Sequence, residues 1–287
     1  MTYEVATLEE YGFKEHKVLK IVWHVLRVIL IAFAIFMLYA AIVIIAIQSF
    51  NKSNDITKFT GFTFDNYIHM FDKKSLTDSI KNTFLTSIIA VLISTICGTL
   101  IAIGLYYLPS KYRQKILLLN NIPLLNADIV TGISIMLIFS MVLPVFPYIF
   151  GFGTLLIAHI FFTLPYIILS VLPKMKEIDK DMLNASLDLG IKPFKSLIKV
   201  IVPAVKGGIF SGMVLAFTIS FEDFVVGYFT TGNGFSTMSI WIYSSIGRKS
   251  LYPGVYAFST VLTFISMLCI VLYNLWKGRK GNAKKVK

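Results

Sequence analysis

The sequence predicts an all-α, polytopic membrane protein with six transmembrane helices. Of its 287 residues, 56% are hydrophobic and 15% are charged, whereas soluble domains average about 45–50% apolar and about 25% charged residues. The mean hydropathy of +0.75 agrees with this. A membrane-spanning helix needs about 20 mostly apolar residues, and six stretches of the chain meet that requirement. The composition excludes an ordinary soluble enzyme and a disordered chain.

The expected spans follow one another from residue 28 to residue 276. The first, 28–47, holds no charged residue. It is too long for a signal-peptide core and no small-residue cleavage site follows it, so we expect an uncleaved anchor. Pro165 predicts a kink in the fourth span. The spans after the first are 84–107, a third that ends near residue 143, and then 153–172, 208–229 and 254–276.

The basic residues predict the orientation of this transmembrane domain, 28–276. The segments 1–27, 108–121, 173–207 and 277–287 together hold 20 of the 27 Lys and Arg residues, and the alternate loops hold seven. Cytoplasmic segments carry an excess of Lys and Arg. We therefore expect a protein of the cell (plasma) membrane with both termini and the loops 108–121 and 173–207 in the cytoplasm. We interpret the basic tail as a topology signal beside membrane lipid, with no nucleic acid as a partner.

Three acidic residues fall within expected spans: Asp128, Glu222 and Asp223. A carboxylate in a span costs about 2.5–3.5 kcal/mol or more, which makes each a functional candidate. No Lys or Arg lies in any expected span. If the third span starts at Pro123, Asp128 lies near the cytoplasmic headgroups; if the helix starts near Lys115 and bends at Pro123, Asp128 lies near mid-membrane.

Small residues recur every four positions in the fifth span. This pattern predicts close helix packing in lipid, against a helix of this chain or of a partner. Continuing the helix at 3.6 residues per turn brings Asp223 and Gly227 close to the same face, with Glu222 about 100° away. The acids could face a substrate pathway or form a structural hydrogen-bonded pair. The packing residues are Gly208, Gly212, Ala216 and Ser220.

The cytoplasmic loop 173–207 reads as a short helix followed by a second segment. Asp179 or Asp181 can cap the helix, Gly190 suits the left-handed position after its end, and Pro193 begins the next segment. An apolar stripe of Met182, Ala185 and Leu189 predicts either docking into a groove of a soluble partner or an interfacial helix on lipid.

The same loop resembles that of ABC importer permeases, whose pattern is E-A-A, three residues, Gly, nine residues and I-x-L-P. This chain has Asn184-Ala185-Ser186, then Gly190, then Val200 to Pro203. Asn184 and Ser186 depart from the pattern. The stretches GFTFDNYIHMF, NADIVTGISIMLIF and AFTISFEDFVVGYFTTG are similar to the second (C) permease of spermidine/putrescine importers.

This resemblance implies the ABC importer permease (MetI-like) fold and a role as a non-catalytic subunit of an ATP-driven polyamine importer. It further implies a second permease subunit (a heterodimer), two copies of an ATPase that docks at Asn184, Ala185, Ser186, Gly190 and Pro203, and an extracytoplasmic polyamine-binding protein. Residues 207–212 give GxxxxG, but Met213 follows in place of the Lys that a phosphate-binding loop requires. We therefore expect no ATP chemistry, no cofactor and no metal in this chain.

For polyamine cargo, carboxylates would offset the lost hydration of ammonium groups, and aromatic faces attract cations. We expect the pathway to include Glu222, Asp223 and Asp128 with Phe221, Phe224 and Tyr228. The alternatives are an importer of another solute, such as ferric ion or a small anion, and a polytopic membrane enzyme. The acid pair argues against an anionic solute. The sequence contains neither the HExxH nor the GxSxG motif, which argues against an enzyme.

Overall fold

The computed structural model describes residues 17–53, 58–146, 149–179, 181–232, 234–246 and 252–285. These residues are mostly helical, and the β pairing among them is one isolated bridge between Asn51 and Phe62. The prediction of an all-α fold is confirmed for them. Most of the expected N-terminal segment 1–27 and the last two residues of the expected tail lie outside the described residues. The chain forms two compact units, which we describe separately: Met1–Met70 with Leu251–Lys287, and Phe71–Ser250.

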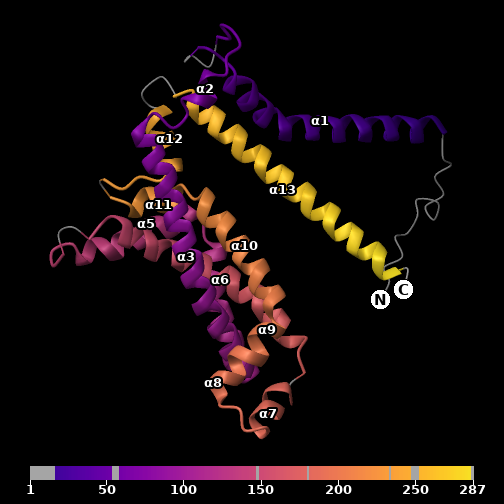
Figure 1. Ribbon diagram of the computed structural model, residues 1–287, viewed down its shortest axis with the longest axis vertical. Helices are drawn as coiled ribbons and strands as arrows, with labels where there is room; N and C mark the ends of the chain where they lie inside the picture. The colour runs from indigo at the N-terminus through magenta and orange to yellow at the C-terminus, as the bar shows by residue number, and fades with distance from the viewer. Residues whose placement is uncertain are drawn as a thin grey trace. The chain divides into compact units, whose positions relative to one another are not determined.

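The first unit contains α1 (Lys17–Ser49), α2 (Asp65–Ile68) and α13 (Gly254–Lys285) (Figure 1). Helix α1 is long and apolar enough to span a membrane, and none of its apolar stretch is buried within the molecule. An apolar surface that the protein does not cover matches lipid tails rather than water. Helix α1 therefore has the surface of a lipid-facing anchor.

Asn51 organises the polar segment that follows α1. Its side chain is fully buried, and its Nδ2 donates to the Gln48 Oε1 at 2.8 Å and to the Lys58 carbonyl at 2.9 Å. Its Oδ1 accepts the backbone N–H of Ser53 and Thr60. Because one side chain satisfies four groups, this loop is held without a longer strand pair.

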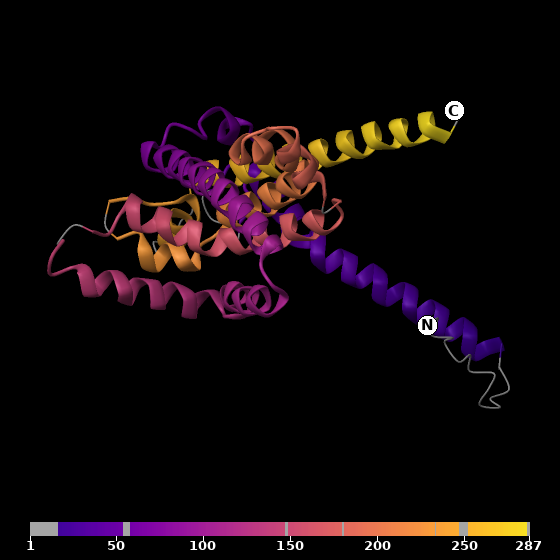
Figure 2. The same ribbon diagram turned by 90° about the horizontal axis from the view of Figure 1, so that it is seen from below.

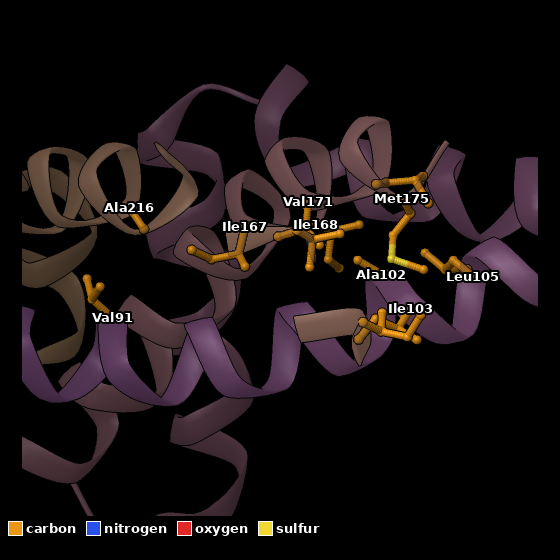
Figure 3. Close-up of a cluster of buried hydrophobic side chains, with 12 residues drawn as sticks. Val91, Ala102, Ile103, Leu105, Ile167, Ile168, Val171, Met175 and Ala216 are labelled. Carbon is orange, nitrogen blue, oxygen red and sulfur yellow. The ribbon is translucent and has the colours of Figure 1, made fainter. Parts of the chain in front are cut away.

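The core of the second unit lies between three long helices: α3 (Lys74–Tyr107), α6 (Phe152–Lys176) and α10 (Lys206–Glu222). They run side by side (Figure 1), and Figure 3 shows their apolar side chains meeting between them. A Cβ at Gly98 would lie only 2.8 Å from the Cβ of Ile167, so Gly98 allows α3 to approach α6. The labelled core residues are Val91, Ala102, Ile103, Leu105, Ile167, Ile168, Val171, Met175 and Ala216.

Two further helices are joined by a sharp bend. Helix α4 (Ser110–Leu125) passes through Pro123, and α5 (Asp128–Val142) leaves it at 105° (Figure 2). The helix thus begins at Ser110, well before Pro123, and it breaks at Asn126–Ala127 rather than at Pro123. The remaining helical segments are α7 (Asp181–Asp188), α8 (Pro193–Ser196), a π-helical turn (Leu197–Ile201), α9 (Val202–Ala204), α11 (Val225–Thr230) and α12 (Met238–Ile246).

Among the described residues, α1, α3 and α6 are single helices long and apolar enough to cross a membrane. If each of two bent pairs counts as one span, α4 with α5 and the segment Pro193–Ala204 with α10, the number is five. The apolar part of α13, Gly254–Cys269, is a shorter helix at the place of the sixth expected span. Helix α6 continues through Pro165 without interruption.

Candidate functional site

The small residues of α10 lie against α6. Gly208, Gly212, Ala216 and Ser220 are all buried. A Cβ at Gly208 would be 2.7 Å from the carbonyl oxygen of Ser170, and a Cβ at Gly212 would be 3.2 Å from the Cα of Ile167. The stripe therefore meets a helix of this chain, at a distance that larger side chains would prevent.

Helix α10 ends at Glu222, and α11 begins at Val225 after a two-residue break. The prediction of one continuous fifth span, 208–229, is wrong at this point. Asp223 has an extended backbone (φ −59°, ψ 131°), and its carboxylate accepts the backbone N–H groups of Val226 at 3.2 Å and Gly227 at 2.7 Å. A short acidic side chain that caps the next helix competes with continued helical hydrogen bonding.

Near this break, the three acids of the expected spans come together. Asp128, at the start of α5, and Glu222 and Asp223, at the end of α10, line one pocket of about 210 Å³. Asp128 and Glu222 are exposed, whereas the Asp223 side chain is 9% exposed. No group of three His, Cys, Asp or Glu residues with metal-binding geometry occurs in the described part of the chain. The other lining residues are Phe162, Ile219, Phe224, Val225 and Val226.

His159 lies directly behind this pocket, on α6. Its side chain is 2% exposed, its Nδ1 is 2.7 Å from the Ser220 Oγ, and its Nε2 is 3.6 Å from the Asp223 Oδ2. The sequence gives no sign of the link between His159 and Asp223, because that link depends on the break after Glu222. Ser220 is 1% exposed, so this Ser–His–Asp arrangement has no access for a reacting substrate.

The expected aromatic residues separate into two groups. Phe224 lines the acidic pocket, and its ring lies 5.5 Å from that of Tyr228 and 4.8 Å from that of Tyr243. Phe221 instead packs edge-on against Phe84 of α3 at 5.0 Å and does not line the pocket. Tyr243, on α12, joins this aromatic cluster without having been singled out by the sequence.

The loop 173–207 folds as two joined helical segments at one end of the second unit (Figure 1). Asp179 accepts the backbone N–H of Asp181 at the start of α7. Gly190 has a φ of +79°, and the bonds from Gly190 N to Leu187 O and from Ile191 N to Ser186 O close the helix end. This is the left-handed helix-ending motif that favours glycine.

One face of α7 is packed and the other is open. Leu183 contacts the apolar core, and the buried hydroxyl of Ser186 hydrogen-bonds that of Ser196 on α8. Met182, Ala185 and Leu189 are exposed, as is Asn184. Ser186, which replaces the second Ala of the E-A-A pattern, thus faces inward. Pro203 lies within α9, between the π-helical turn and α10.

Comparison with solved structures agrees with this fold. A crystal structure of a bacterial ABC transporter involved in the import of the acidic polysaccharide alginate contains a chain with a TM-score of 0.66 and 16% identity. The alignment covers 92% of this chain and 98% of the other. At this identity the likeness shows the fold alone.

Comparison with characterised sequences is more specific. The chain is 31% identical over 252 residues to the spermidine/putrescine transport system permease protein PotC of Escherichia coli (strain K12), covering 86% of this chain and 94% of PotC. It is 26% identical over 240 residues to the putrescine transport system permease protein PotI of the same strain, covering 82% and 85%.

The family described as the binding-protein-dependent transport system inner membrane component matches residues 98–279. This region contains the bent pair α4–α5, the acidic pocket, the loop 173–207 and most of the described part of α13. The chain is accordingly a multi-pass membrane protein, and it belongs to the family of binding-protein-dependent transport system inner membrane components.

Proposed function

We propose that this chain is the permease subunit of an ATP-driven polyamine importer and that it forms half of the translocation pathway. The observation that carries the proposal is the convergence of Asp128, Glu222 and Asp223 on one pocket. Polyamines carry several ammonium groups, and carboxylates compensate for the hydration that a cation loses inside a membrane. The names of the relatives PotC and PotI support the same substrate class.

Phe224 gives the acidic pocket an aromatic wall, and Tyr228 packs against Phe224. A ring face attracts an ammonium group with about 0.5–2 kcal/mol, depending on exposure. In such a pocket the acids would hold the ammonium groups of a flexible polycation. The aromatic and apolar walls would contact the methylene segments between these groups. The same pocket would repel an anionic cargo such as a polysaccharide acid, which separates this chain's proposed substrate from that of its structural relative.

The loop 173–207 is the proposed contact with the ATPase. The exposed stripe of Met182, Ala185 and Leu189 offers an apolar face at helical spacing, and the inward face of α7 is tied to α8 and the core. A helix held rigidly on one side can transmit a displacement of a partner to α10. We place this loop and both termini in the cytoplasm, with a second permease, two ATPase subunits and an extracytoplasmic polyamine-binding protein completing the transporter.

Uptake measurements on the assembled transporter test this proposal. Proteoliposomes that contain the permease pair and its ATPase, with the binding protein outside, should accumulate spermidine or putrescine when ATP is inside. Unlabelled polyamine should compete for uptake, whereas ferric citrate or an alginate oligosaccharide should not. Uptake of either competitor without polyamine uptake would contradict the proposed substrate class. The orientation can be tested with a reporter enzyme that is active only outside the cytoplasm, fused after Lys287. Activity of this fusion would contradict a cytoplasmic C-terminus.

A further inference from the structure

We propose that His159 is a positioning residue of the acidic pocket, whose imidazole fixes the Asp223 carboxylate in the orientation that faces a cationic group of the substrate. The inference rests on the proposed function, because it assigns His159 a part in the same cation site. His159 itself does not line the pocket. It would act through Asp223, from the buried side.

The Asp223 carboxylate is held from two directions. The backbone N–H groups of Val226 and Gly227 bind Oδ1 and Oδ2 from the first turn of α11. The Nε2 of His159 approaches Oδ2 from α6 at 3.6 Å. This distance is too long for a hydrogen bond in the present geometry, but it is short enough that a small movement of the carboxylate would form one. The imidazole thus limits how far the carboxylate can turn away from the backbone donors.

Ser220 and Asp223 together favour one protonation state of the His159 ring, whose Nδ1 faces Ser220 and whose Nε2 faces the acid. Its hydroxyl lies 2.7 Å from Nδ1 and has no other hydrogen bond among the described residues. If the Ser220 O–H donates to Nδ1, the ring proton is on Nε2 and points to the carboxylate. The opposite tautomer would place the Nε2 lone pair against a carboxylate oxygen, which is repulsive. The buried Nε2 has no hydrogen-bond partner among the described residues, so Asp223 is the acceptor available to it.

Packing keeps the imidazole in place. Its ring centre lies 4.9 Å from that of Phe162, which lines the acidic pocket. The ionisable groups that face this region are Asp128 from α5 and Glu222 and Asp223 from α10. With no Lys or Arg in any expected span, the imidazole N–H is a side-chain donor that supplements the backbone donors of Val226 and Gly227 at Asp223. A donor that carries no permanent charge would steady the carboxylate without neutralising it, so the acid stays available to an ammonium group.

Two substitutions separate this role from simple packing. In His159→Gln, the side-chain amide nitrogen can occupy the place of Nε2 and still donate to Asp223. In His159→Asn, the shorter amide can reach only Ser220. We expect His159→Asn to raise the polyamine concentration for half-maximal uptake about tenfold with a similar maximal rate, which corresponds to roughly 1.4 kcal/mol. His159→Gln should stay within about twofold of the unchanged transporter, because its amide N–H still points at the Asp223 carboxylate from the place of Nε2.

For each His159 variant, co-purification with the partner subunits should be measured on the membranes used for uptake. Uptake by Asp223→Asn should be measured in parallel. Equal impairment of the Gln and Asn variants, unchanged uptake by His159→Asn, or loss of assembly in His159→Asn alone would overturn the positioning role. If Asp223→Asn also transports normally, the proposed cation site itself fails. If Asp223→Asn is impaired while His159→Asn is normal, the site stands and only the inference about His159 is wrong.

Discussion

Asp128, the first residue of α5, and Glu222, the last residue of α10, line the same pocket although they are far apart in the sequence. Each stands at an interruption of a bent or broken span, where the backbone leaves its helical path. Asp128, in the first turn of α5, also benefits from the exposed N–H groups of that helix. Broken helices inside transporters commonly form substrate sites. The meeting of these two residues is therefore the structural basis of the proposed cation pathway.

The close contact between α10 and α6 makes a direct prediction about stability. Gly208→Ala should lower the free energy of unfolding by about 1–3 kcal/mol, since its Cβ would overlap the Ser170 carbonyl oxygen. Gly207→Ala is the matched control, because a Cβ there meets nothing within 4 Å. In a helix this control should be neutral or stabilising by up to about 1 kcal/mol. Thermal unfolding of the purified transporter in detergent measures both, and equal melting temperatures would contradict the close packing.

The exposed face of α7 makes a prediction about the ATPase. Ala185→Glu places a charge at the centre of the exposed apolar stripe, and we expect it to reduce ATPase retention in a pull-down and uptake at least about tenfold. Asn184→Glu adds the same charge one residue earlier, where the permease pattern has Glu. That variant should retain the ATPase. Loss of binding in both variants, or in neither, would contradict docking through the stripe.

The two groups of aromatic residues give a third prediction. Phe224→Leu removes a ring that lines the acidic pocket, whereas Phe221→Leu removes a ring that packs against Phe84 outside it. We expect the first substitution to raise the half-saturating spermidine concentration about three- to tenfold, which corresponds to a lost cation–π contact of roughly 0.7–1.4 kcal/mol. The second should leave it nearly unchanged. Uptake kinetics of both variants, normalised to the amount of assembled complex, measure this difference. A larger rise of the half-saturating spermidine concentration in Phe221→Leu than in Phe224→Leu would contradict the assignment.

Helical periodicity predicts part of this structure well. The small-residue face of α10 and the left-handed Gly190 both follow from local sequence rules. Such rules succeed because lipid requires regular helices, and because only a residue without a side chain can approach a neighbouring helix this closely or adopt a positive φ easily.

The arrangement of the acidic pocket could not be predicted from helical periodicity alone. Extrapolating α10 as a regular helix through Asp223 misses the break after Glu222, where the Asp223 carboxylate accepts the first N–H groups of α11. The bend at Asn126–Ala127, the approach of His159 and the contact of Gly98 with Ile167 depend on which helices become neighbours. These are tertiary effects, and no short stretch of sequence contains them.

The central claim is that the acids at the end of α10 carry a polycation through the membrane. The most direct test is spermidine uptake by the Glu222→Gln, Asp223→Asn double variant, assembled with its partners. Both substitutions keep size and hydrogen-bonding capacity, so assembly should persist. Because a hydrogen bond to a charged group is worth about 1.5–3 kcal/mol, uptake at low spermidine concentration should fall about tenfold or more, and more than uptake of the less charged putrescine. Normal spermidine uptake by the assembled double variant, or failure of that variant to assemble, would contradict the pathway role and favour a structural one.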